Sequence, residues 1–277
     1  MAWQTEFNRA RSIGCESLRE TIMALKGKES VTEQVFRSGW LETLNRSPSL
    51  IVDGWYSPPP HGITILTATP DDPSRLSYSS LRSEEYWPSG RCIDWRNGLL
   101  LAYCSPIDRI SGRAGDIAIT LYFGADQRIR EFFRRAHHVV ADLVDSISVG
   151  ESPKALLKRA EAAFSANCLI NCVTSVTDPA SYNIGHTVPL LDPNSLAEQL
   201  SEDQRSFCRT QRRFLNYTAD WNLTNGLQFT FEPQIRSSVD AQLPQLTFHY
   251  LVQIENDKLH VCRDVDVLLR EYDLVSL

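Results

Sequence analysis

Two short stretches of the sequence carry side chains that could act as nucleophiles or metal ligands. Cys104 and Ser105 follow an apolar run, but the serine lacks a Gly-x-Ser-x-Gly turn and no histidine is adjacent, so nucleophilic catalysis has little support. Cys168 and Cys172 are four residues apart, a spacing that would place both thiols on one face of a helix. Their surroundings favour the start of a strand, so we expect both to be buried small apolar residues rather than zinc ligands.

Three histidines stand where an imidazole could reach a site. His61 follows three consecutive prolines, which cannot join a central strand ladder and therefore predict a rigid loop. Such a loop could present His61 to a cleft, or His61 could be an ordinary surface residue. His137 and His138 are adjacent in a predicted helix, so at most one of them faces inward, where a structural role is the common one.

The hydrophobic pattern predicts an α+β chain. Helices are expected over residues 5–25, from 32 onward with Thr32 as the N-cap, and over 128–147, 152–166 and 195–216. Strands are expected at 49–52, 63–66, 98–103, 116–123, 226–231, 246–254 and 258–262, with Asn256-Asp257 as a hairpin turn.

Residues 68–97 interrupt this pattern with a long irregular insertion rich in Pro, Ser, Asp and Arg. Its four large aromatic residues favour an ordered, packed loop: Tyr78, Tyr86, Trp87 and Trp95. Composition shows no internal repeat, no low-complexity tract and no Gly/Ser linker. We therefore expect one domain over residues 1–277.

Charge and composition limit the partners. The net charge is −6 and no run of Lys and Arg exceeds two residues, which argues against a nucleic-acid partner. The apolar stretches are too short to cross a bilayer, and the N-terminus lacks the apolar segment of a signal peptide, so we expect a cytoplasmic protein without a membrane partner. Seven widely scattered cysteines argue against a disulfide framework.

Four local patterns, in a fixed order along the chain, resemble the pita-bread family of methionine aminopeptidase, aminopeptidase P and creatinase. They are the helix junction at residues 27–33, the strand at 115–120 that contains Asp116, the Gly-His loop at 183–189, and the Phe-Thr-Phe-Glu-Pro sequence at 229–233. The resemblance covers roughly residues 5–270 and leaves the insertion unmatched. It implies a pita-bread (creatinase/aminopeptidase) fold, with a curved antiparallel sheet and helices on its outer face. It also implies a chain that starts directly at the catalytic-type domain, without the N-terminal domain of longer members.

The resemblance also implies a metal site that is incomplete here. Members with two metal ions hold them with two aspartates, one histidine and two glutamates, of which Asp116, His186 and Glu232 are present. The first aspartate would fall at or near Cys104. The last glutamate would fall on residues 246–254, which contain no acid, and His249 stands roughly in its place. Strand alternation allows either His249 alone, or both of its neighbours, to face the cleft.

Two chemistries remain open for this reduced set. Asp116, His186 and Glu232 could together hold one Mn, Fe, Co or Zn ion, whereas a second ion would have too few carboxylates. Alternatively no metal is bound, as in creatinase, and His186 exchanges protons while the two carboxylates orient it or bind a cationic group. His61 matches a substrate-contacting histidine of the family.

The leading expectation is therefore an enzyme acting on a small polar, amino-acid-like substrate by hydrolysis, C–N or C–C cleavage, or elimination. One alternative is an aminopeptidase or Xaa-Pro dipeptidase-like metallopeptidase acting on short peptides with substitute ligands. Another is a non-catalytic binding module on the same scaffold. Many members of the family are dimers, so the resemblance also allows a homodimer. The expected site requires Asp116, His186 and Glu232 to converge.

Overall fold

The computed structural model describes residues 8–57, 59–173, 175, 177–188 and 190–275. The chain divides into two compact units. The first comprises Met1–Gly124 and Pro189–Gln211, and the second comprises Ala125–Val188 and Arg212–Leu277. The expectation of one domain stays a prediction.

The first unit is built around a three-stranded antiparallel sheet. Its strand order is β2-β3-β5, so β3 is central. The elements are α1 (Arg9–Leu25), α2 (Glu33–Asn45), β1 (Leu50–Ile51), β2 (Ile63–Ala68), α3 (Tyr78–Leu81), β3 (Leu99–Cys104), β4 (Ile107–Asp108), β5 (Ile117–Tyr122) and α6 (Glu202–Thr210). The short strands β1 and β4 pair separately.

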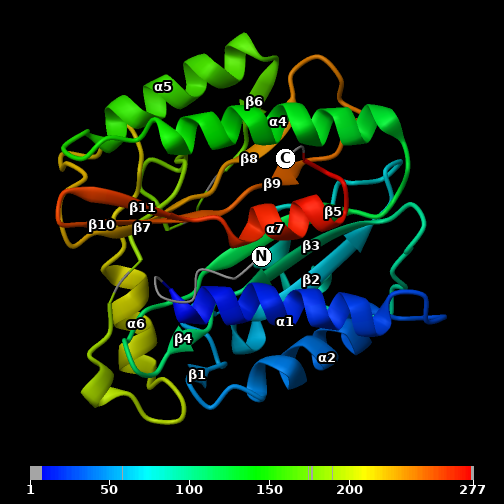
Figure 1. The fold of residues 1–277 in the computed structure, drawn as a ribbon, viewed down its shortest axis with the longest axis horizontal. Coiled ribbons are helices and arrows are strands. Elements are labelled where there is room, and N and C mark those ends of the chain that lie inside the picture. Colours follow the sequence, from blue (N-terminus) through cyan, green and yellow to red (C-terminus); the bar gives the residue numbers. More distant parts are fainter. Residues whose placement is uncertain (1–7, 58, 174, 176, 189, 276–277) are drawn as a thin grey trace. The chain divides into compact units, whose positions relative to one another are not determined.

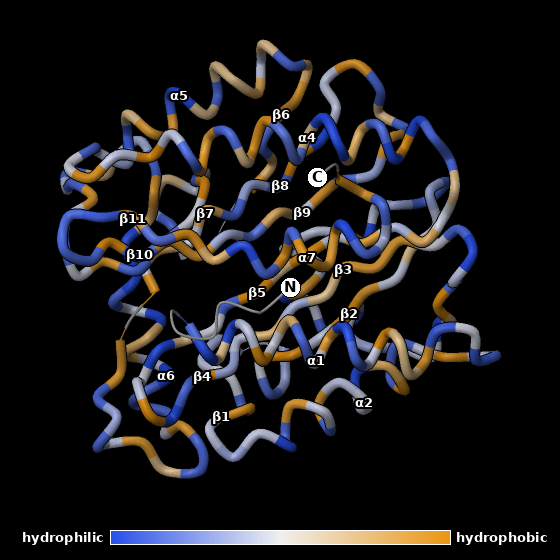
Figure 2. The backbone as a smooth tube through the Cα atoms, viewed as in Figure 1, coloured by the Kyte–Doolittle hydropathy of each residue, from blue (hydrophilic) through white to orange (hydrophobic). Residues whose placement is uncertain are grey.

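The sheet of the first unit is apolar and covered, because every residue of β2, β3 and β5 is buried. Figure 2 shows β3 and β5 coloured as hydrophobic segments. Gly14 of α1 lets that helix lie directly on β5, since an added Cβ would come within 2.5 Å of Ile117. The indole of Trp40 in α2 donates to Ser17 Oγ of α1 at 3.0 Å and links the two helices, which run side by side in Figure 1.

The insertion at 68–97 is an ordered part of this unit, as its aromatic residues predict. Glu33, fully buried in the first turn of α2, accepts hydrogen bonds from the Thr67 and Ser89 amides at 2.6 and 3.0 Å and pairs with Arg75. The apolar side chains of Leu76, Leu81 and Ile93 in the insertion are buried. A carboxylate with this many donors fixes the path of the insertion across α2.

The second unit contains two separate three-stranded antiparallel sheets, with strand orders β11-β10-β7 and β6-β8-β9. Its elements are α4 (Gln127–Asp145), α5 (Pro153–Ala166), β6 (Leu169–Asn171), β7 (Gln228–Phe231), β8 (Gln234–Ser237), β9 (Leu246–Thr247), β10 (Tyr250–Glu255), β11 (Lys258–Cys262) and α7 (Asp264–Glu271). The turn between β10 and β11 has φ values of +52° at Asn256 and +56° at Asp257, as its sequence predicts.

Several local expectations are confirmed in the second unit and in α2. The side chains of Thr32 and Ser152 accept from the backbone at the starts of α2 and α5. Of the adjacent pair in α4, the side chain of His137 is 14% exposed and that of His138 is 77% exposed, so only one faces inward.

Other expectations were wrong. The helix expected at 195–216 is confined to α6, because a capping box at Ser201 and Gln204 starts it late. The residues after α6 instead form backbone hydrogen bonds with the Gly-His loop: Leu215 N donates to Gly185 O at 2.8 Å. The strand expected at 246–254 is broken at residues 248 and 249, and α7 was not anticipated. The helix expected from residue 5 begins at Arg9, and residues 5–7 lie outside the described residues.

The cysteine pair also differs from expectation. Cys168 is exposed, at the turn after α5, with a φ of +54°, and Cys172 is only partly buried. Neither thiol is therefore a core residue. Within the described ranges, the helices are all too short or too polar to cross a membrane.

Candidate functional site

Three side chains of the second unit meet around one carboxylate. His186 Nε2 lies 3.6 Å from Glu232 Oε1, and His249 Nε2 lies 3.3 Å from Glu232 Oε2. The three side chains are 7%, 12% and 1% exposed for His186, Glu232 and His249. Each imidazole approaches a different oxygen, so the carboxylate lies between the two rings. We call these three residues the imidazole–carboxylate cluster.

The pairing of β7 with β10 sets the positions of Glu232 and His249. Tyr250 is opposite Phe231 in that ladder, so the residues just outside it, Glu232 and His249, are also opposite each other. Opposed residues of an antiparallel pair place their side chains on the same face. Phe248 packs on Phe133 of α4 with ring centroids 6.4 Å apart, and Tyr250 donates to Asp266. Of residues 248–250, His249 is therefore the one whose side chain faces Glu232.

A glycine brings the His186 loop against β7. Gly185 has a φ of +150°, and a Cβ there would come within 2.0 Å of the Thr230 carbonyl oxygen. This close approach lets His186 N donate to Thr230 Oγ1 at 3.0 Å, while Thr230 N donates to His186 O at 2.8 Å. Glu232 N in turn donates to Ile184 O at 2.8 Å. These hydrogen bonds fix the Gly-His loop at 183–189 against the Phe-Thr-Phe-Glu-Pro sequence at 229–233.

The surroundings of His186 define which ring nitrogen carries a proton. Nδ1 lies 3.0 Å from the main-chain oxygen of Thr187, and since a carbonyl only accepts, Nδ1–H must be the donor. Nε2 is then the nitrogen that faces Glu232. It interacts favourably with a carboxylate only as an imidazolium, or when a proton or another cation lies between them. The cluster is therefore suited to holding and transferring a proton.

Asp116 lies in the first unit, immediately before β5, and is 2% exposed. Burial raises the pKa of the Cys104 thiol well above its usual value, and the nearby Cys15 and Asp116 raise it further. Cys104 is therefore held as a neutral thiol, which is a poor nucleophile and a poor metal ligand. The approach of Asp116 to His186 and Glu232 stays a prediction.

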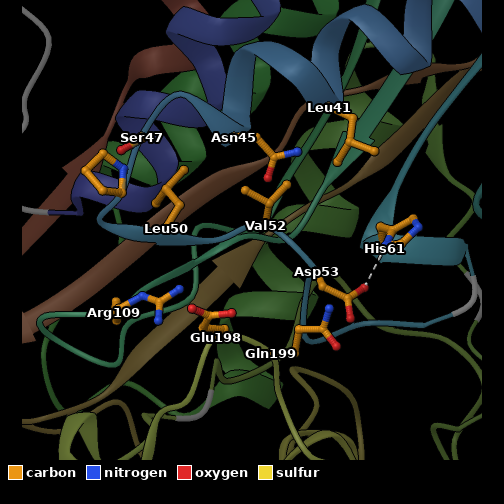
Figure 3. A pocket seen from close by; sticks show the side chains of 11 residues that line it. Leu41, Asn45, Ser47, Leu50, Val52, Asp53, His61, Arg109, Glu198 and Gln199 are labelled. Atoms are coloured by element: carbon orange, nitrogen blue, oxygen red, sulfur yellow. Dashed lines mark hydrogen bonds and ion pairs between the residues drawn. The ribbon is translucent and has the colours of Figure 1, made fainter.

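His61 also belongs to the first unit, where it lines an open cavity of about 410 Å³ (Figure 3). Its side chain is 53% exposed, and its Nδ1 lies 3.1 Å from Asp53 Oδ1. Arg205 of α6 pairs with the same aspartate. His61 has a φ of +58°, an uncommon conformation for a residue with a side chain. A substrate-contacting role for His61 stays a prediction.

The donor sets do not fit the two-metal site that the resemblance implies. Across the described ranges, no three or more His, Cys, Asp and Glu side chains are arranged to hold a metal ion. Glu232 has imidazoles on both of its oxygens, with His249 where a second glutamate would stand. At Asp116, the strand register places Cys104 opposite Ile117, so the neutral Ser105 stands opposite Asp116. Hard divalent cations favour several carboxylate oxygens over such a set.

Comparison with known proteins identifies the fold. No protein-family model and no curated protein matches the chain. Its structure is similar to an X-Pro aminopeptidase from Thermotoga maritima (TM-score 0.59, 11% identity), and to prolidases from Thermococcus sibiricus (0.60, 13%) and Pyrococcus furiosus (0.58, 15%). These matches cover 92%, 92% and 94% of this chain but only 58%, 56% and 64% of those proteins.

The chain therefore has the pita-bread fold, as the four ordered motifs predicted. Identities this low show the fold alone. Of the expected site residues, the structure brings together His186, Glu232 and His249. The sequence contained one signal for His249, the acid-free strand, but the register that directs it toward Glu232 depends on long-range pairing.

Proposed function

We propose that this protein is a divergent pita-bread enzyme that acts on a small polar, amino-acid-like substrate by metal-free acid–base chemistry. The reaction would be a hydrolysis, a C–N or C–C cleavage, or an elimination. The observation that carries the proposal is a buried carboxylate between two imidazoles, one of which has its tautomer fixed by a main-chain oxygen.

His186 is the proposed acid and base. Its Nδ1–H stays bound to the Thr187 oxygen, so a proton enters and leaves at Nε2. Glu232 stabilises the imidazolium whenever Nε2 is protonated, and its second oxygen lies 3.3 Å from His249 Nε2. Because the cluster is almost entirely shielded from water, these charge interactions are stronger than they would be at the surface. The carboxylate could also bind a cationic group of the substrate.

Two alternatives carry less support. An aminopeptidase or Xaa-Pro dipeptidase-like metallopeptidase would agree with the names of the similar structures. It would need substitutes for the two missing carboxylates, and the neutral Ser105 and Cys104 are poor ones. A non-catalytic binding module needs no shielded proton site, and the fixed tautomer of His186 has no purpose in it.

The proposal is tested by a substrate panel followed by substitution. Purified protein is incubated with N-acyl, N-carbamoyl and guanidino amino acids and with Xaa-Pro dipeptides, in chelator and in Mn²⁺, and products are detected by mass spectrometry. We expect turnover of a non-peptide amino-acid derivative that persists in chelator. Turnover of dipeptides only with Mn²⁺ would favour the metallopeptidase, and turnover of nothing would favour the binding module.

The active preparation is then compared with His186→Ala and with a matched control, His138→Ala, whose side chain on α4 is 77% exposed. We expect His186→Ala to lower kcat by about 100-fold or more, the usual contribution of a general acid or base, and the control to be unchanged. Full activity of His186→Ala would show that the cluster is not the site.

A further inference from the structure

The open cavity that His61 lines in the first unit joins segments that lie far apart in the sequence. Its volume is about 410 Å³, and its lining comes from α2, β1, the turn after β4 and the segment before α6 (Figure 3). The lining combines apolar side chains with charged ones of both signs. Small-molecule sites have volumes of this order and combine apolar walls with a few placed polar groups.

The charge of Asp53 in this lining is already balanced. Its Oδ1 lies 3.1 Å from His61 Nδ1, and its Oδ2 accepts a hydrogen bond from Arg205 Nη2 of α6. The same arginine donates from Nη1 to Gly54 O at 2.9 Å, which fixes its position. Both oxygens of Asp53 therefore have a partner within the protein, and a ligand of the cavity must be bound by other charges.

Arg109 is a fixed cation with unused hydrogen-bond donors. Its main-chain N donates to Ser49 O at 2.8 Å, beside the pairing of β1 with β4. Its Nη1 donates to Ala197 O at 3.2 Å, whereas its Nε is shielded from water and has no hydrogen-bond partner among the described residues. A guanidinium has five N–H donors, so this side chain can still bind an anion such as a carboxylate.

Glu198 supplies a negative charge at the same end of the cavity. It follows Ala197, whose oxygen accepts from Arg109, and Figure 3 shows the Arg109 and Glu198 side chains at one end of the lining. Although both residues are described, no hydrogen bond or ion pair joins their side chains (Figure 3). Glu198 is exposed, so its carboxylate is accessible to a ligand. A cation and an anion placed in this way match a ligand that carries both charges.

The apolar part of the lining lies next to these charges. Leu50 of β1 and Val52 are 4% and 9% exposed, and Leu41 of α2 completes this part. Covering such a surface with an apolar group of a ligand stabilises the complex by about 25 cal/mol for each Å² removed from water. The cavity therefore favours a ligand that has an apolar group beside its two charges.

We propose that this cavity binds a free amino acid with an apolar side chain. Arg109 binds the α-carboxylate, Glu198 binds the α-ammonium group, and the apolar part of the lining contacts the side chain. A ligand that lacks either charge leaves one of the two residues without a partner. The site belongs to the first unit and does not depend on the acid–base chemistry proposed for the second.

Isothermal titration calorimetry of the full chain tests the ligand class. Valine, leucine, methionine and phenylalanine are titrated first, and the tightest binder is compared with its amide, its N-acetyl derivative and glycine. We expect each of these three probes to bind at least about 10-fold more weakly, because each lacks the carboxylate, the ammonium group or the side chain. Absence of binding by all four amino acids, or equal binding of the three probes, would overturn the proposal.

Two substitutions test the two charged contacts separately. Arg109→Met should remove the preference for the amino acid over its amide, and Glu198→Gln should remove the preference over the N-acetyl derivative. Each substitution should also weaken binding of the amino acid by about 10-fold. The matched controls, Arg96→Met and Glu20→Gln, lie at exposed positions and should bind as the wild type does.

Glu198→Gln decides the question if Arg109→Met disturbs the segment that Arg109 contacts through Ala197 O. The Glu198 side chain is exposed, so its exchange for the amide should leave Tm unchanged. A Glu198→Gln protein that kept the wild-type preference for the amino acid over its N-acetyl derivative would overturn the proposal.

Discussion

Two clusters of the second unit each join an imidazole to a buried carboxylate, on the two faces of residues 248–250. On one face, Asp266 of α7 accepts from His137 Nε2 at 2.9 Å and from Tyr250 OH at 2.6 Å, with Arg263 Nη1 at 3.3 Å. On the other face, Glu232 lies between two imidazoles, at 3.3 and 3.6 Å. In the first cluster, the His137 and Tyr250 contacts are shorter than the imidazole contacts of Glu232, and Arg263 adds a permanent cation.

This difference separates a structural network from a proton-transfer site. Burial raises the pKa of Asp266, but hydrogen bonds from His137 and Tyr250 and the charges of His137 and Arg263 more than offset it, so the pKa lies below its usual value. Asp266 is thus held as a carboxylate and fixes α7 against α4 and β10. Each Glu232 oxygen faces an imidazole, whose charge depends on whether it carries a second proton.

The largest expected effect is the loss of turnover in Glu232→Gln. The amide keeps the shape but cannot stabilise an imidazolium at His186, so kcat should fall by about 100-fold or more. Tm should fall less than in Asp266→Asn, because the contacts of Glu232 at 3.3 and 3.6 Å are longer than the His137 and Tyr250 contacts of Asp266. Steady-state kinetics and thermal unfolding of the same preparation check this, and a large fall in Tm with unchanged kcat would reverse the assignment of the two clusters.

Asp266→Asn should give the opposite result, a large loss of stability. Removing the charge from a buried network with three donors is expected to lower the free energy of unfolding by about 3 kcal/mol. Because the folded-state pKa of Asp266 is lowered, its contribution is present above the unfolded-state pKa of about 4 and is lost as pH falls through the folded value. Urea unfolding at neutral and acidic pH should show the variant closest to the wild type in acid. A constant difference at all pH values would contradict this.

The sequence predicted the fold better than it predicted the site. The order of the four motifs was sufficient to predict the pita-bread fold, and two of them meet through a required close approach, that of Gly185 to Thr230. The helix expected at 195–216 failed because pairing of Leu215 with Gly185 overrode a helical pattern.

The partners of the site residues were harder to predict for a similar reason. That His249 faces Glu232 follows from the opposition of Tyr250 and Phe231, which no local pattern contains. That Arg82 lies on Tyr56 depends on the whole path of an irregular insertion. Local sequence patterns therefore identified the candidate site residues, whereas long-range strand pairing determines which of their side chains lie close together.

The smallest expected effect is that of Tyr250→Phe. Tyr250 belongs to the Asp266 cluster through its hydroxyl and is the next residue after His249 of the imidazole–carboxylate cluster. Loss of a hydrogen bond to a charged group should lower the free energy of unfolding by about 2 kcal/mol, and by much less in the Asp266→Asn background. His249 is the next residue, so a strand loosened at Tyr250 should also shift the His249 imidazole resonances in NMR spectra. The shift should exceed that in a control, Tyr217→Phe, whose side chain is exposed and lies outside the β7–β10 ladder. If Tyr250→Phe lowered stability but left the His249 resonances in place, the structural network would hold α7 alone and would not position the imidazole beside Glu232.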